Sequence, residues 1–191
     1  MKIITISREF GSGGRELGKR LAEALHIPCY DHELIDRLAE ESGLSKEYIT
    51  NESEYASHSS WTAAAFSSVR SFGVPSNQDY LWAIQRRIIL ELGQKENCVI
   101  VGRCATNILK DKSLKIFIHA PFEERVQNVI RRTGREEASA RKLVKKMDKE
   151  RKAYYEYFTD SKWLDMTQYD LCIDSSRFSM EQIIEIVKRC L

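Results

Sequence analysis

The sequence has none of the features that mark several broad classes of protein. Its five cysteines are scattered and never form a C-x-x-C pair, which argues against a disulfide framework and against a zinc site. No apolar run approaches the length that crosses a bilayer, and no charged leader with an apolar segment precedes the first apolar stretch. We therefore expect neither a membrane-spanning helix nor a secretion signal, and a reducing cytoplasm as the location.

Net charge is also small, because 30 Lys and Arg residues stand against 28 Asp and Glu residues. The resulting +2 does not indicate nucleic acid or a membrane surface as a partner, so any electrostatic argument must be local. With 42% hydrophobic residues, the 191-residue chain is long enough for one well-buried core. We expect a single domain over residues 1–191 with small-molecule partners, and a homo-oligomer stays open.

Five short apolar segments alternate with amphipathic helical segments. The apolar segments are predicted strands over residues 3–6, 27–30, 98–101, 114–118 and 169–173. A proline at position 121 is expected at the first position of the helix that follows the fourth strand. Alternation of buried strands with helices predicts an α/β fold, with a five-stranded parallel sheet and helices on both faces.

A glycine-dense turn separates the first strand from the first helix. Three of the four residues Gly11, Ser12, Gly13 and Gly14 are glycines, which is more than a simple turn needs. Glycines let backbone N–H groups converge, and the start of a helix adds positive potential. The loop therefore predicts a site for a phosphate or another anion.

Two other stretches differ from the rest of the chain. Residues 44–76 combine many serines with aromatic residues and show weak periodicity, so we expect an irregular or short-helical excursion above the core. Between residues 121 and 152, eleven Lys and Arg residues face six Asp and Glu residues, which makes this the one distinctly basic region.

In a parallel sheet, ligands bind beyond the carboxyl ends of the strands. The residues that directly follow the predicted strands should therefore share one rim of the molecule. They are Ser7 to Glu16, Asp31 to Glu33, Gly102, Arg103, His119 and Asp174. These glycine, acidic and basic residues are what a nucleotide site requires.

With these segments in order, the chain resembles the cytidylate kinase-like family of P-loop nucleoside monophosphate kinases over nearly its full length. The matching residues are Tyr30-Asp31, Arg37, Gly102-Arg103, the stretch from Leu114 to Pro121, Asp148-Lys149-Glu150-Arg151, and Ile173 to Ser176. Their order and spacing together are specific, although no single one is. The resemblance implies a three-layer P-loop NTPase fold, with an acceptor-binding insertion at residues 44–76 and a basic lid at residues 131–158.

The glycine loop departs from the Walker pattern G-x-x-x-x-G-K-[ST], in which the lysine reaches the β/γ phosphates and the hydroxyl holds Mg²⁺. Arg8 stands at the first glycine position and Gly14 at the lysine position. The next residue is Arg15, and Glu16 is taken to stand at the Ser/Thr position. Arg8 or Arg15 would supply the missing positive charge. We therefore expect a variant branch of the family that lacks the Walker lysine.

The resemblance implies roles for particular side chains. Phosphate and ATP contacts are expected from Arg8, Gly11, Ser12, Gly13, Gly14, Arg15 and Glu16. Acceptor contacts are expected from Asp31, Arg37 and Arg103, although Asp31 would equally cap the next helix and Arg37 would equally be solvated. Arg15, Arg131, Arg135 and Arg151 would close over the transferring phosphoryl group as catalytic residues. Mg²⁺ would be held through the phosphates, without a protein metal site.

The reaction implied is transfer of the γ-phosphoryl group of ATP to a nucleoside monophosphate, with CMP or dCMP favoured. One alternative is a nucleotide-binding sensor without catalysis, and another is a kinase for a different small acceptor. A dinucleotide-dependent oxidoreductase is a third, because Gly11-x-Gly13 opens a helix and Asp31 lies about twenty residues further on. Against it, Glu16 stands where a third glycine is expected.

Overall fold

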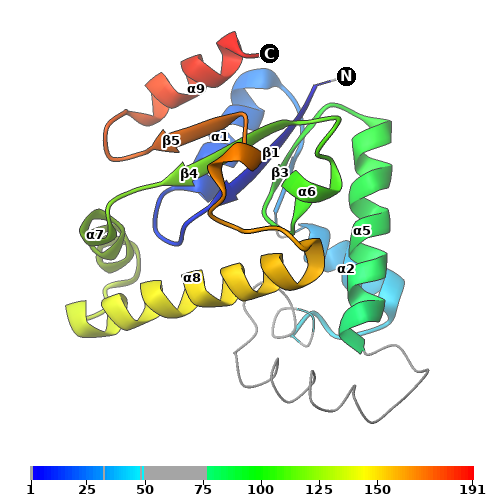
Figure 1. Ribbon diagram of the computed structural model, residues 1–191, viewed down its shortest axis with the longest axis horizontal. Helices are drawn as coiled ribbons and strands as arrows, with labels where there is room; N and C mark the ends of the chain where they lie inside the picture. The colour runs from blue at the N-terminus through cyan, green and yellow to red at the C-terminus, as the bar shows by residue number, and fades with distance from the viewer. Residues whose placement is uncertain (1, 32, 48, 50–76) are drawn as a thin grey trace.

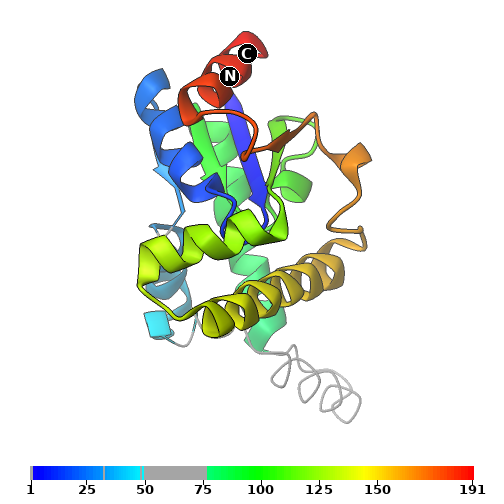
Figure 2. The same ribbon diagram turned by 90° about the vertical axis from the view of Figure 1, so that its left-hand side faces the viewer.

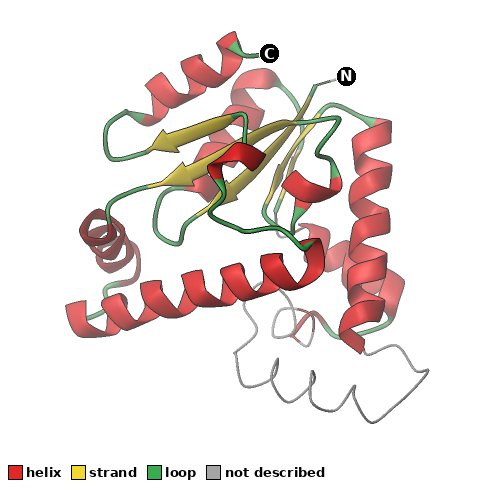
Figure 3. Cartoon of the chain, viewed as in Figure 1, coloured by secondary structure: helices red, strands yellow, loops and turns green. Residues whose placement is uncertain are grey.

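The computed structural model describes residues 2–31, 33–47, 49 and 77–191. Within these residues the chain forms a parallel sheet with helices on both faces (Figures 1 and 3). Its strands are β1 (Ile3–Arg8), β2 (Cys29–Tyr30), β3 (Cys98–Val101), β4 (Leu114–His119) and β5 (Leu171–Asp174). They lie in the order β2-β3-β1-β4-β5. The predicted five-stranded α/β architecture is confirmed.

The helices of the described residues follow the strands in alternation. They are α1 (Gly14–Leu25), α2 (Glu33–Ser42), α5 (Asn77–Lys95), α6 (Ala105–Ile108), α7 (Phe122–Thr133), α8 (Glu137–Thr159) and α9 (Met180–Arg189), with a 3₁₀ turn, η1 (Met166–Gln168). No helix in this part of the chain is long and apolar enough to cross a membrane.

Several predicted boundaries differ by a few residues, and two of them were wrong at prolines. Pro121 caps α7 rather than opening it, because its ψ of 142° is extended and the helix begins at Phe122. The strand predicted over residues 27–30 is shorter, because Pro28 has no N–H to donate and contributes only its carbonyl, which accepts from the Val99 N–H. β2 therefore begins at Cys29.

Alternate residues of each strand point to opposite faces of the sheet, and both faces are covered. Ile4 and Ile6 of β1 pack with α1 and α9, whereas Ile3 packs with α2, α5 and α6. All six residues of β1 are buried, as expected for a central parallel strand. The glycine loop therefore follows directly from the buried central strand of the sheet.

The pair formed by α7 and α8 lies beyond the carboxyl ends of the strands (Figures 1 and 2). Near the C-terminal end of α8, Tyr154 and Tyr155 pack with Phe117, Trp163 and Tyr169. This aromatic cluster fixes α8 to the sheet. Residues 131–158, the predicted lid, correspond to the end of α7, the connection and nearly all of α8.

The predicted insertion at residues 44–76 lies mostly outside the described residues. Of the part that is described, Leu44 and Ile49 pack against the apolar side of α2 and α5. The site-forming segments that can be compared with the sequence predictions are therefore the loop after β1, the ends of β2 to β5, and the α7–α8 pair.

Candidate functional site

The glycine loop turns from β1 into α1 through two left-handed residues. Gly11 has φ +85° and Gly13 has φ +84°, conformations that favour glycine. A Cβ at Gly11 would also lie 2.7 Å from the carbonyl oxygen of Arg125, so α7 approaches the loop closely. The Ser12 hydroxyl donates to the carbonyls of Glu9 (2.9 Å) and Ile118 (3.0 Å). The Ser12 hydroxyl thus stabilises the conformation of the loop.

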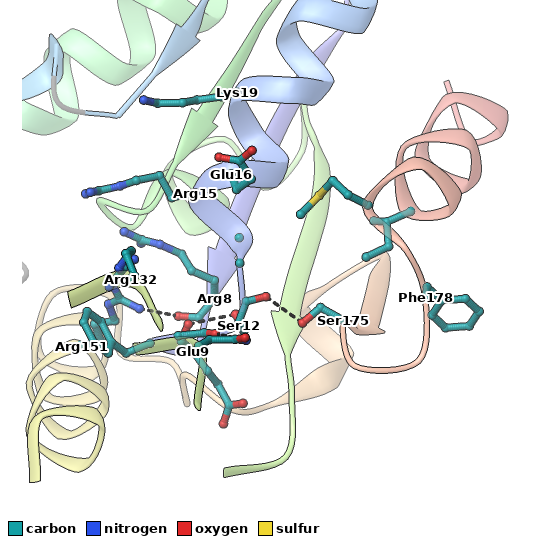
Figure 4. Close-up of a pocket in the computed structure, with 17 residues that line it drawn as sticks. Arg8, Glu9, Ser12, Arg15, Glu16, Lys19, Arg132, Arg151, Ser175 and Phe178 are labelled. Atoms are coloured by element: carbon teal, nitrogen blue, oxygen red, sulfur yellow. Dashed lines mark hydrogen bonds between the residues drawn. The ribbon is translucent and has the colours of Figure 1, made fainter. Parts of the chain in front are cut away.

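An open cavity of about 510 Å³ lies over this loop (Figure 4). This volume suits a small ligand, since such sites commonly span about 300–1,000 Å³. Besides residues 8–16 it is lined by Lys19, Asn128, Arg132, Arg151, Ser175, Phe178, Met180 and Ile183. In Figure 4 the nitrogen-bearing ends of Arg8, Arg15 and Lys19 lie on one side of the loop, with Ser175 and Phe178 on the other.

The two carboxylates of this cavity are each paired with an arginine. Glu16 Oε1 lies 2.6 Å from Arg20 Nε, one helical turn along α1. Glu9 Oε2 lies 3.2 Å from Arg125 Nε and accepts from the Ala120 N–H. Burial raises the pKa of Glu9, while Arg125 opposes that shift. The Glu16 charge that would repel a triphosphate is therefore offset within the protein.

Beside this cavity lies a second, much smaller one of about 20 Å³, which we call the inner cavity. It is lined by Ser7, Arg8, Gly102, Arg103, Cys104, Thr106, Arg151, Tyr154, Tyr155 and Trp163. Three of these residues are arginines that are 3–6% exposed, and no described carboxylate lines the cavity with them. Three guanidinium groups that line one small cavity create a positively charged environment, which favours an anion at this place.

Among the arginines of the inner cavity, Arg103 gives the clearest indication of an anion site. It is 3% exposed, and its Nη1 has no hydrogen-bond partner among the described residues. Its φ of +57° is also unusual for a residue with a side chain. The backbone is held there by its neighbours, because the Arg103 carbonyl accepts from Gln85 Nε2 at 3.1 Å. The side chain is thus held in the interior with an unused donor.

The structure brings together part of the predicted set. Arg8, Gly11, Ser12, Gly13, Gly14, Arg15, Glu16 and Arg151 line the outer cavity, and Arg8, Arg103 and Arg151 line the inner one. Arg151 joins the two, because its Nη1 donates to the Arg8 carbonyl at 3.1 Å. The rim residues therefore share one end of the sheet, as predicted, but divide between separate cavities.

Four predicted residues line neither cavity. Asp31 Oδ2 instead lies 2.6 Å from Arg15 Nε. The Arg37 guanidinium lies over the Tyr30 ring, 5.4 Å from its centroid. Arg131 and Arg135 are exposed, and Arg131 donates to Asn128 Oδ1. Arg132, one position along α7, lines the outer cavity instead, because each helical residue rotates by about 100° from the last.

The sequence analysis did not predict the residues of α7 and α8 that hydrogen-bond to the backbone of the glycine loop. Arg125 is 6% exposed, and its Nη1 donates to the Phe10 carbonyl and to Asp148 Oδ2. Asp148 Oδ1 in turn accepts from the Phe10 N–H at 2.7 Å. Asn128 Nδ2 donates to the Gly11 carbonyl at 2.9 Å. Asp148 stood in the matched Asp-x-x-Arg stretch, but only the fold shows that it reaches the loop.

Both the described side chains and the Walker spacing bear on metal ligation. Among the described residues, no group of three or more His, Cys, Asp and Glu side chains could hold one. Counted from Arg8, the Walker spacing also places Arg15, rather than Glu16, at the hydroxyl position.

The strand order, the glycine loop between β1 and α1, and the α7–α8 pair define the fold of the P-loop kinases. Shikimate kinase from Bacteroides thetaiotaomicron has this fold, with a TM-score of 0.59 and 15% identity over 99% of this chain and 97% of that one. An uncharacterised protein from Eubacterium ventriosum matches with a TM-score of 0.69 and 31% identity, covering 98% and 99% of the two chains.

The chain belongs to the cytidylate kinase-like family, whose model matches residues 3–177. The resemblance seen in the sequence is confirmed. A cytidylate kinase from Pyrococcus horikoshii is 29% identical over 192 residues, which cover 99% of this chain and 88% of the relative. A cytidylate kinase from Methanopyrus kandleri is 25% identical over 200 residues, which cover 99% and 92% of the two chains.

Proposed function

We propose that the protein transfers the γ-phosphoryl group of ATP to a nucleoside monophosphate, with CMP or dCMP as the favoured acceptor. The observation that carries this proposal is the junction of the two cavities. Arg8 and Arg151 line both of them, so a phosphate in the glycine loop and a phosphate in the arginine-lined inner cavity would meet between these two side chains. The names of the relatives support cytidine as the base.

The outer cavity suits the phosphate donor. Its glycine loop and the start of α1 would take the triphosphate, because backbone N–H groups and the helix dipole favour negative charge there. At the end of the cavity opposite Arg8, Arg15 and Lys19, Phe178 offers an exposed ring on which a purine base would stack (Figure 4). We assign the adenine to that end.

We place the acceptor phosphate at the inner cavity, whose present volume of about 20 Å³ holds about one water molecule, so its lining must open to admit the phosphate. Arg103 would supply its unused Nη1 donor, and the guanidinium fork matches phosphate oxygens. Asp31, Arg37 and residues 44–76 would bind the rest of the acceptor. For Asp31 this requires the Arg15 contact to change when the acceptor binds.

Phosphoryl transfer requires little covalent chemistry from the protein itself. An oxygen of the acceptor monophosphate forms a bond to the γ-phosphorus, and the bond between that phosphorus and the β,γ-bridging oxygen breaks. The products are ADP and a nucleoside diphosphate. Arg8, Arg15 and Arg151 would neutralise the charge on the transferring group. Arg131 and Arg135 would join them if the lid at residues 131–158 closes. Mg²⁺, bound through the phosphates, would supply further positive charge.

A coupled assay of ADP release over a panel of nucleoside monophosphates tests the proposal. We expect CMP or dCMP to give the highest kcat/KM. Arg103→Met should raise the KM for the acceptor by about tenfold to a hundredfold, the range of a charge-assisted hydrogen bond, and leave ATP affinity unchanged. The exposed Arg189→Met serves as the matched control.

One other candidate is a protein that binds nucleotide without turnover, since Gly14 and Arg15 depart from the Walker pattern. Calorimetry distinguishes it, because tight ATP binding with no ADP release from any monophosphate would support the sensor and remove the kinase. ADP release with a sugar or an aromatic hydroxy acid, but with no monophosphate, would instead support a kinase of another small acceptor.

A further inference from the structure

Two residues of the glycine loop, Arg8 and Gly14, depart together from the Walker pattern. Gly14 is the first residue of α1 and lacks the positive φ of Gly11 and Gly13. Its backbone conformation is therefore open to any residue, and does not require glycine.

Space is what requires glycine at this position. A Cβ at Gly14 would lie 2.7 Å from Arg8 Cβ and 2.9 Å from Arg8 Cγ. These atoms are the first two of the arginine side chain, and the Arg8 backbone is paired with Ile118 of β4, so neither can move away easily. The Arg8 side chain and any side chain at position 14 therefore exclude each other.

The exclusion involves Arg8 alone. The next atom that a Cβ at Gly14 would meet is Ile118 Cβ, at 3.6 Å, which is an ordinary van der Waals contact. Without Arg8 Cβ and Cγ, a Cβ at position 14 would therefore meet only this ordinary contact.

Of the two arginines that could replace the lysine, burial favours Arg8. Arg8 is 4% exposed and lines both cavities. Its main chain is held by Arg151, whose Nη1 donates to the Arg8 carbonyl. The Arg15 side chain is 38% exposed, and its Nε lies 2.6 Å from Asp31 Oδ2. Arg15 is thus already engaged by an acidic group at the surface.

We propose that Arg8 and Gly14 form one compensated exchange, in which the phosphate-binding cation of the loop has moved from the first residue of α1 to the last residue of β1. Arg8 binds the donor phosphates that the Walker lysine would otherwise reach, and Gly14 leaves room for the Arg8 stem. This inference rests on the proposed function, because it takes ATP as the ligand of the outer cavity.

Calorimetry with a non-hydrolysable ATP analogue and Mg²⁺ tests the role of the charge. Arg8→Met keeps the length of the stem and removes the guanidinium, so the fold should be retained. We expect the affinity to fall by about tenfold to a hundredfold, as for loss of a charge-assisted hydrogen bond. Arg189→Met should bind as the unmodified protein does. Arg8→Met binding with unchanged affinity would overturn the exchange alone, whereas an unmodified protein that binds no analogue would overturn the proposed function as well.

Paired variants test the exchange itself. Gly14→Ala should lower the melting temperature when Arg8 is present and cost much less in an Arg8→Gly background. Gly14→Lys alone should bind the analogue poorly, whereas the double variant Arg8→Gly/Gly14→Lys should recover most of the affinity that Arg8→Gly loses. If Gly14→Ala is equally costly in both backgrounds, or the double variant binds no better than Arg8→Gly, the two positions are independent and the inference is wrong.

Discussion

Single buried thiols illustrate how strongly this fold changes the chemistry of a residue. All five cysteines are free, but they differ in environment. Cys98 of β3 is buried and Cys29 of β2 is partly buried, and burial raises the pKa of each thiol to about 11. Cys190, next to the C-terminus, is exposed. Since the thiolate is the reactive form, reactivity should follow exposure and pKa.

We predict that iodoacetamide at pH 8 labels Cys190 first in the native protein. A thiol with a pKa near 11 is ionised to only about one part in a thousand at that pH, so Cys29 and Cys98 should react mainly after unfolding in urea. Mass spectrometry of the labelled peptides measures the order, and Cys190→Ser should remove the fast phase. Native-state labelling of Cys98 as fast as that of Cys190 would contradict the burial.

The same raised pKa values give a dependence of stability on pH. In the unfolded chain these thiols ionise near 9, whereas in the folded chain they keep their protons to about 11. The folded state therefore binds more protons than the unfolded state in this interval. The contribution of these two thiols to the free energy of unfolding falls as pH rises from about 9 to about 11. In urea titrations, Cys98→Ala should show a smaller loss of stability over that interval than the unmodified protein.

At the scale of elements, the packing of α1 on β3 positions the glycine loop. Gly18 lies in the middle of α1, where alanine is ordinarily more stable by about 0.5–1 kcal/mol. Here a Cβ would lie 2.5 Å from Val101 Cγ2, so the helix approaches the strand more closely than a side chain allows. The close approach brings the start of α1, and with it the loop, against the carboxyl ends of β1 and β3.

We predict that Gly18→Ala destabilises the protein by about 1–3 kcal/mol, the usual cost of overpacking, despite the better helix propensity of alanine. Urea unfolding measures the change, with the exposed Glu23→Ala on the same helix as control. In a Val101→Ala background the cost of Gly18→Ala should shrink, which a double-mutant cycle would show. A cost that is the same in both backgrounds would mean that the contact is relieved in another way.

At the scale of the whole molecule, the glycine loop is held both by the sheet and by the α7–α8 pair. The sheet carries it through β1, and α7 and α8 hold it through Arg125, Asn128 and Asp148. Ser175, after β5, donates to the Ser12 carbonyl at 2.7 Å and holds the opposite side. A ligand in the outer cavity would therefore stabilise contacts among segments that are distant in sequence.

We predict that saturating MgATP raises the melting temperature and that NAD does not. At a ligand concentration of about one hundred times Kd, mass action adds about 2.7 kcal/mol, which for a chain of this size is a shift of about 5–10 °C. Thermal unfolding followed by intrinsic fluorescence measures both ligands in parallel. An equal shift with NAD would revive the oxidoreductase interpretation, whereas no shift with ATP would count against nucleotide binding in the outer cavity.

The sequence alone determined the elements and the general place of the site. Apolar runs such as Cys98–Val101 and the glycines after β1 are local signals, because strand burial and left-handed turns depend on the residues themselves. Their alternation with helices required a parallel sheet, and a parallel sheet places its loops at one edge. The predictions for the described loop, the five strands and the rim of polar residues follow from this.

Only the tertiary structure decided which side chains do what at that edge. Arg103 and Arg151 point into the protein while Arg131 and Arg135 are exposed, because helix rotation and contacts with distant segments set the direction of each side chain. Gly14 shows the difference best. In the sequence Gly14 is one of several glycines in a turn. In the fold, its lack of a side chain leaves room for Arg8 Cβ and Cγ, and these atoms come close to Gly14 only when β1 and α1 are packed together.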